Sequence, residues 1–163
     1  AATGDWLVFV DADSHPSAGL FANVAEVIQE GRVIAGGSTV TIAERYFVPR
    51  MAVGGWNLLS RLRRWAAGSF IFCEAAAFRE IGGFSTELFV SEEIDFSKRL
   101  QKLARLRGKR MTILTRHPLV TSVRKLHLYT PREHLQFLVR LVLQRGRPMK
   151  RREECAIWYD GRR

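Results

Sequence analysis

Two patterns of apolar residues occur along this chain: continuous apolar runs, which predict strands, and apolar residues at helical spacing, which predict helices. Residues 6–10 are apolar at every position, a pattern typical of a strand buried on both faces in a parallel sheet. Further strands are predicted over residues 33–42, which contain Gly36-Gly37, over 69–73, and over 111–114 with a continuation or bend after Pro118 toward Val123.

Between these strands, apolar residues recur at the three- and four-residue spacing of helices. The first helix is expected to have Ser14 as its N-cap and Pro16 in its first turn, and to end at Gly31. Further helices are predicted over residues 47–65, 74–81, 95–106 and 130–145. The alternation of strands and helices predicts the α/β class with a mixed sheet.

Two of these helices carry a distinct apolar stripe. The first stripe consists of Leu58, Leu62 and Trp65, and the second of Phe96, Leu100 and Leu103. The helix over 130–145 opens with Thr130-Pro131-Arg132-Glu133, which has the form of a capping box with proline at the first helical position. Residues 1–146 are therefore expected to form one domain, and residues 147–163 a basic C-terminal tail.

Length and composition indicate a globular protein. The chain has 163 residues, of which 47% are hydrophobic and 26% charged, so disorder is not the default interpretation. No apolar run approaches the roughly 20 residues of a membrane span, and the chain does not open with a secretory signal. A central-looking strand directly at the N-terminus, with no Met before it, leads us to expect a chain cut from a longer one.

The charge of the chain is divided unevenly. Of the net charge of +10, residues 1–97 contribute 7 Lys/Arg against 12 Asp/Glu, whereas residues 98–163 contribute 19 against 4. The acidic part can hold a cation, and the basic part can face phosphates, an anionic membrane surface or nucleic acid. A solvated basic face is the alternative. Cys73 lies in an apolar run and is expected in the core, and no cysteine spacing suggests zinc.

Asp11 and Asp13 follow the first predicted strand directly. Ligands of open α/β sheets bind at the carboxyl ends of strands, and two carboxylates there can share Mg²⁺ or Mn²⁺ while leaving positions for diphosphate oxygens. The alternative is that an aspartate merely caps the helix that follows.

A second acidic cluster, Glu92, Glu93 and Asp95, precedes the apolar face that begins at Phe96. Such residues favour a helix N-terminus through the dipole. Their mutual repulsion also tends to raise the pKa of one of them, as a general base requires. Gly82-Gly83 before the cluster would let the connecting loop fold over a site. Farther along, Ser122 and Arg124 offer hydroxyl and guanidinium donors suited to phosphates.

Two segments together resemble the signatures of family 2 glycosyltransferases. GDWLVFVDADSHP, residues 4–16, is similar to the family's metal-binding strand. The segment from Ala66 to Leu103 is similar to its second signature, in which Gly-Gly-Phe precedes an acidic pair and a helix ending in Arg-Leu. Together they cover about a third of the chain.

This resemblance implies a partial GT-A fold, a Rossmann-like sandwich with a mixed, mainly parallel sheet. It implies transfer of a sugar from a nucleoside diphosphate sugar to a hydroxyl of a sugar, lipid or other acceptor, as in the synthesis of cell-envelope polysaccharide. Asp13 and Asp11 fall on the metal-binding pair, for Mn²⁺ or Mg²⁺. Glu93 falls on the base of inverting members, supported by Glu92 and Asp95. Donor contacts are expected from Asp11, Gly68, Ser69, Ser122 and Arg124.

The chain also departs from the family pattern. The family usually has Asp after the first Glu of the acidic pair, whereas this chain has Glu92-Glu93, which leaves the choice of base between the two open. The Gln-x-x-Arg-Trp motif of processive members is absent, and so are the N-terminal elements that hold the nucleoside. We therefore expect a non-processive enzyme, cytoplasmic or peripheral at the inner membrane face through its basic C-terminal part, whose isolated chain binds donor poorly and can self-associate.

Two other classes of function stay open from sequence alone. One is a basic module that binds nucleic acid or an anionic membrane surface, although the aromatic residues do not alternate with basic ones as a stacking platform requires. The other is an inactive fragment kept for assembly.

Overall fold

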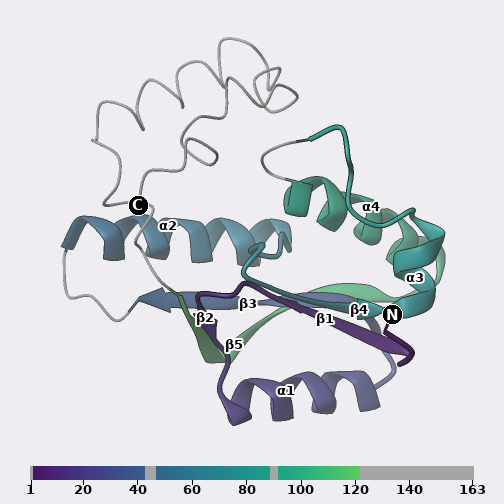
Figure 1. Ribbon diagram of the computed structural model, residues 1–163, viewed down its shortest axis with the longest axis horizontal. Helices are drawn as coiled ribbons and strands as arrows, with labels where there is room; N and C mark the ends of the chain where they lie inside the picture. The colour runs from purple at the N-terminus through teal and green to yellow at the C-terminus, as the bar shows by residue number, and fades with distance from the viewer. Residues whose placement is uncertain (1, 43–46, 89–91, 122–163) are drawn as a thin grey trace.

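The computed structural model describes residues 2–42, 47–88 and 92–121, which form one five-stranded sheet with helices on both faces (Figure 1). The strands are β1 (Trp6–Val10), β2 (Ser14–His15), β3 (Val33–Ile42), β4 (Phe70–Glu74) and β5 (Arg110–Thr121). The helices are α1 (Ala18–Gln29), α2 (Phe47–Arg63), α3 (Ala75–Glu80) and α4 (Glu92–Leu106). Figure 1 shows α1 on one face of the sheet and the other three helices on the opposite face.

The strands lie in the order β1-β4-β3-β5-β2. Among the described strands, the pairing of β3 with β5 is parallel, while β1–β4, β3–β4 and β2–β5 are antiparallel. The sheet is mixed, as predicted, but the prediction that it is mainly parallel is wrong for this part of the chain. Strand β4 causes two of the antiparallel pairings, because it runs opposite to both of its neighbours, and β2 beside β5 causes the third.

Strand β1 confirms the apolar run at residues 6–10, but not its expected burial on both faces. Val8 and Val10 are 41% and 40% exposed, whereas Leu7 and Phe9 pack against the core formed with α4. Within the described residues, β1 lies at one edge of the sheet and has a neighbour on one side, β4. The strand that is buried on both faces is instead β3, in which nine of ten residues are buried.

The N-cap of helix α1 lies three residues later in the chain than predicted. Ser17 is the N-cap, and its Oγ accepts from the backbone N–H of Leu20 at 3.1 Å. Ser14, the predicted cap, belongs instead to β2, where its Oγ lies 3.1 Å from Thr121 Oγ1 of β5. Ser14 is therefore a sheet residue, and Pro16 precedes the cap. The helix ends before Gly31, whose φ of +70° confirms the predicted stop.

Helix α2 is anchored to the sheet by a polar residue. Asn57 Oδ1 accepts from the backbone N–H of Val40 at 2.9 Å, and Asn57 Nδ2 donates to the carbonyl of Val40 at 2.8 Å. Val53 and Trp56 pack on the core from the same side. Leu58 and Leu62 of the predicted stripe consequently point outward, at 59% and 73% exposed.

Helix α4 starts at Glu92, three residues before the predicted start, so the acidic cluster forms its first turn. Carboxylates there interact favourably with the helix dipole. The predicted apolar face is confirmed, since Phe96, Leu100 and Leu103 are buried against β3 and β5. The apolar face of α4 therefore holds the helix against the core, and its N-terminal turn carries the acidic residues.

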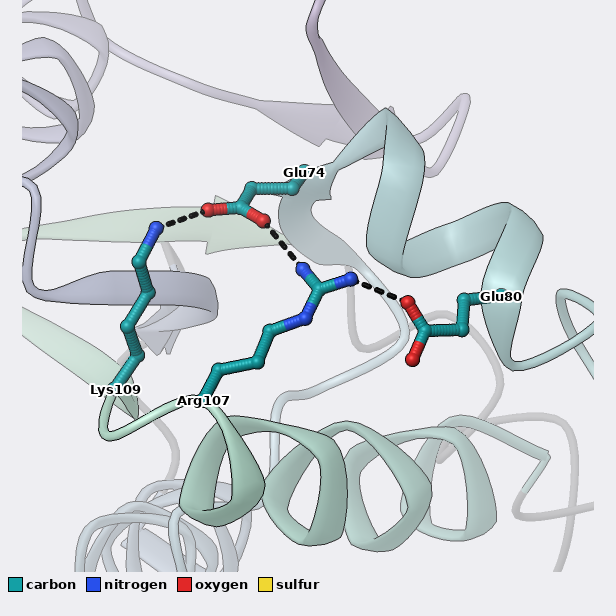
Figure 2. A network of polar contacts seen from close by, with 4 residues as sticks. All are labelled: Glu74, Glu80, Arg107 and Lys109. Atoms are coloured by element: carbon teal, nitrogen blue, oxygen red, sulfur yellow. Dashed lines mark hydrogen bonds and ion pairs between the residues drawn. The ribbon is translucent and has the colours of Figure 1, made fainter.

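The other end of α4 is held by a network of charged side chains (Figure 2). Glu74, at the end of β4, accepts from Arg107 at 3.0 Å and from Lys109 at 2.7 Å, and Arg107 also pairs with Glu80 of α3. The side chain of Glu74 is 17% exposed, so these contacts are less screened by water than isolated surface pairs. The network joins β4, α3 and the turn after α4.

Close backbone approach explains the paired glycines of β3. A Cβ on Gly36 would lie 2.7 Å from the carbonyl oxygen of Thr112 on β5 and would also collide with the ring of Phe72.

Gly36→Ala should therefore lower the free energy of unfolding by about 2 kcal/mol or more, because overpacking a core costs about 1 to 3 kcal/mol. Gly54→Ala is the matched control, since its Cβ would enter open space on α2. It should stabilise the chain by about 0.5 to 1 kcal/mol. Equal urea midpoints for the two variants would contradict this packing argument.

Several predictions from sequence fall outside the described residues. These are the helix over 130–145, the domain boundary at 146, the basic tail, and the donor residues Ser122 and Arg124. In the described part of the chain, no helix has the length and apolar character needed to cross a membrane.

Candidate functional site

Three segments meet at one edge of the sheet and bring most of the predicted site residues together. They are the end of β1 with Asp11, the loop before β4 with Gly68 and Ser69, and the first turn of α4 with Glu92 and Glu93. These segments come from both of the sequence signatures, which are separated in the chain by residues 17–65.

The backbone after β1 is fixed on both sides of Asp11. Its N–H donates to the carbonyl of Ser69 at 3.2 Å, which continues the β1–β4 ladder by one bond. Its carbonyl accepts from the N–H of Ser14 at 3.1 Å, which closes a turn over residues 11–14. The side chains of Asp11 and Asp13 remain exposed at this turn. Neither aspartate is the N-cap of α1, so the capping alternative for them does not hold.

The loop that carries Gly68 and Ser69 is fastened to α4. Ser97 Oγ, fully buried, accepts from the N–H of Ala66 at 3.1 Å. Gln101 Nε2 donates to the carbonyls of Arg63 and Arg64, both at 2.8 Å. Arg64 has a φ of +53°, the left-handed conformation that ends α2 and turns the chain toward β4. The loop and the acidic turn of α4 are therefore positioned as one unit.

Glu93 lies against this loop and is only partly exposed. A Cβ placed on Gly68 would lie 3.7 Å from Glu93 Cγ, at ordinary van der Waals distance, so the Glu93 side chain lies directly beside Gly68. Burial raises the pKa of Glu93 to about 7, with smaller raising contributions from the charges of Glu92 and Asp11 and an opposing backbone hydrogen bond. Asp11 is bonded to Ser69 and Glu93 lies beside Gly68, so the two predicted signatures meet at one loop.

The other two acidic residues of α4 differ from Glu93. Glu92 is partly buried and acts on the pKa of Glu93 through its charge. Asp95 accepts from Arg99 Nε at 2.7 Å, and Arg99 in turn donates to the carbonyl of Ile81 at 2.7 Å. Asp95 therefore has a structural partner that ties α4 to the end of α3. A catalytic role for it stays a prediction, as do the roles of Glu92 and Glu93.

The carboxylates at the end of β1 suit a hard divalent cation by their chemistry. Asp11 and Asp13 offer exposed oxygen ligands, the type that Mg²⁺ and Mn²⁺ take. Among the described residues, no group of three or more His, Cys, Asp or Glu side chains is gathered for a metal. Two carboxylates are the protein ligand set of an ion that completes its shell with water and ligand phosphates.

Cys73 lies in the core, and two residues of α4 support the site. Cys73 is fully buried in β4, and burial, reinforced by the charge of Glu74, raises its pKa to about 12, which confirms the predicted core position. Sequence reasoning missed Ser97 and Gln101. The available signal for Ser97 was a polar residue on the apolar side of α4, between Phe96 and Leu100.

Comparison with known proteins bears on the fold. A solved structure of the mannosyltransferase PcManGT from Pyrobaculum calidifontis, in complex with GDP-Man and Mn²⁺, matches 85% of this chain with a TM-score of 0.53 and 20% identity. The chain has a glycosyltransferase-type α/β fold. It spans about a third of the length of that enzyme, 36%. No family model and no curated protein matches the sequence. Membership of family 2 therefore stays a prediction.

Proposed function

We propose that this chain belongs to the catalytic region of a metal-dependent glycosyltransferase of family 2. It would transfer a sugar from a nucleoside diphosphate sugar to an acceptor hydroxyl, with inversion and without processive elongation. The fold of a mannosyltransferase supports the class of reaction. The two sequence signatures support the family, because they are distant in the chain and adjacent in the fold.

The observation that carries the proposal is the position of Glu93. Its carboxylate is partly buried against Gly68 and shares the site with Asp11. A carboxyl group whose pKa is raised to about 7 is matched to proton transfer near neutral pH. Glu92, the alternative base, neighbours it in the first turn and supports it by raising its pKa.

In the proposed reaction, the acceptor hydroxyl oxygen attacks the anomeric carbon of the donor. The bond from that carbon to the diphosphate oxygen breaks, and the nucleoside diphosphate leaves with the electron pair. Glu93 accepts the proton of the hydroxyl during the attack. Such a single displacement inverts the anomeric configuration.

Asp11 and Asp13 would hold Mn²⁺ or Mg²⁺ beside the diphosphate of the donor. The chemistry that such an ion supplies when bound is that of a Lewis acid for the leaving group. Gly68 lies directly beside Glu93 and has no side chain that could compete with a sugar for the Glu93 carboxylate. The carbonyl of Ser69 is occupied by Asp11, so in donor binding the residue can use its hydroxyl group. Ser122 and Arg124 remain candidates for contacts to the phosphates.

The direct test is a transfer assay on the full-length protein with a panel of nucleoside diphosphate sugars, Mn²⁺ and a mixed pool of hydroxyl acceptors. We expect metal-dependent release of nucleoside diphosphate and an inverted product, read by proton NMR of the anomeric centre. A retained anomer would refute the single displacement and the role of Glu93. Binding of nucleic acid in a salt-dependent manner, without metal-dependent donor binding, would refute the enzyme and favour a basic binding module.

A further inference from the structure

Helix α2 carries apolar residues on the side that faces away from the protein. Met51, Leu58 and Leu62 are 62%, 59% and 73% exposed, and their spacing of seven and four residues places them in one line along the helix. A Cβ on Gly54 or Gly55 would meet nothing within 4 Å. Among the described residues, therefore, nothing covers this line of side chains.

Arginine residues flank the apolar line. At 100° per residue, Arg50 and Arg61 lie along one side of it and Arg63 along the other. All three are exposed, and the α2 sequence contains no aspartate or glutamate. The helix thus combines a cationic surface with a protruding aliphatic strip. This is the pattern of helices that lie in the headgroup region of a membrane with anionic lipids.

We propose that the outer face of α2, defined by Met51, Leu58 and Leu62 with Arg50, Arg61 and Arg63, docks on an anionic lipid surface. The aliphatic side chains enter the boundary between headgroups and acyl chains, and the guanidinium groups bind lipid phosphates. Nucleic acid would satisfy the arginines but not the aliphatic strip, which offers no ring for base stacking. The proposal does not depend on the proposed enzymatic function.

Docking through α2 fixes the orientation of the whole domain. Figure 1 shows α1 on the opposite face of the sheet from α2, so α1 faces away from the bilayer. Arg63 lies five residues before Gly68, and Gln101 binds its carbonyl from α4. The candidate site is therefore joined to the docked helix by a short, fastened loop, and it is held at a constant position relative to the lipid surface.

The test compares two double variants of the full chain that change the same residue types. Arg61→Glu with Leu62→Glu alters the outer face of α2. Arg105→Glu with Leu106→Glu alters an equally exposed Arg-Leu pair at the end of α4, where Leu106 is 77% exposed. The two variants have the same net charge, so they differ in where the change lies and not in the total charge of the chain.

Binding is measured by co-sedimentation with vesicles of phosphatidylglycerol and phosphatidylcholine, and with vesicles of phosphatidylcholine alone. We expect the natural chain and the α4 variant to bind the anionic vesicles, and the α2 variant to bind at least about tenfold more weakly. Each surface arginine contributes about fivefold, the equivalent of about 1 kcal/mol. Added salt should weaken the binding of both proteins that bind.

Three outcomes would overturn the proposal. In the first, the α2 variant binds anionic vesicles as well as the α4 variant does. In the second, the natural chain ignores vesicles and the α2 variant melts well below the α4 variant, which would mean that another part of the chain covers the helix. In the third, the natural chain ignores vesicles and forms a dimer that the α2 variant loses, which would make the outer face a contact between two copies.

Discussion

Asp13→Ala should abolish metal-dependent sugar transfer by the full-length protein while leaving its folding unchanged. Asp13 is exposed in the turn that follows β1 and supplies one of two carboxylates proposed to hold the metal. Loss of a Lewis acid at a leaving group removes several kcal/mol of stabilisation from the transition state. We therefore expect turnover to fall by about 10³-fold. The measurement is initial rate against Mn²⁺ concentration, together with the midpoint of thermal unfolding.

Asp5→Ala is the matched control for this substitution. Asp5 is an exposed aspartate at the opposite end of the same strand, and its contact to Ala75 is made by its backbone carbonyl, which the substitution retains. The control should keep full activity. If Asp13→Ala retains activity, or if chelation of divalent ions leaves transfer intact, the end of β1 is not a catalytic metal site.

Glu93→Gln is expected to lower turnover by about 10²-fold or more in the full-length protein, since general-base catalysis contributes at least about that factor. The amide keeps the shape of the side chain beside Gly68 but cannot accept the proton of the acceptor hydroxyl. Donor binding should survive. Glu92→Gln is the matched control and should be mild. If Glu92→Gln proves damaging and Glu93→Gln does not, the two roles must be exchanged.

The pKa of Glu93 adds readouts that do not depend on the absolute rate. Since the base must be ionised, kcat/KM should rise with pH and level off above about 7, and Glu93→Gln should remove that dependence.

The folding stability of the metal-free chain should change with pH in the opposite direction to kcat/KM. The folded-state pKa lies above its ordinary 4.5, so the folded state binds more protons and loses stability as pH rises from about 4.5 through about 7. Glu93→Gln should be more stable than the natural chain at pH 8 and not at pH 4. An unchanged difference in melting temperature across that range would refute the raised pKa.

The elements themselves were largely predictable from sequence, because each reflects local pattern. The apolar run at residues 6–10, the helical spacing before Gly31 and the stripe from Phe96 all correspond to the observed strand and helices. The arrangement of the strands was not predictable in the same way. The apolar pattern of a strand such as β4 does not indicate the direction in which the strand runs in the sheet. Its antiparallel pairing with β1 and β3 is therefore decided by tertiary contacts.

For the candidate site, sequence reasoning identified the acidic residues but not what positions them. The proximity of Asp11 to Glu93 depends on the bond between Asp11 and Ser69 and on the loop held by Ser97, contacts between residues distant in the chain. On α2, Leu58 and Leu62 were recognised as parts of one apolar stripe, but Met51 and the direction that the stripe faces were not. Asn57 decides that direction by binding the backbone of Val40, which a hydrophobic pattern does not record.

The parallel pairing of β3 with β5 has a consequence for synthesis of the protein on the ribosome. Strand β3 is almost wholly buried in the finished sheet, yet its partner ends at Thr121, long after Ile42 has been made. At roughly 5–20 residues per second, the nascent chain passes about 4 to 16 s between these two points. Until β5 has been made, β3, the most thoroughly buried strand of the finished sheet, has no parallel neighbour.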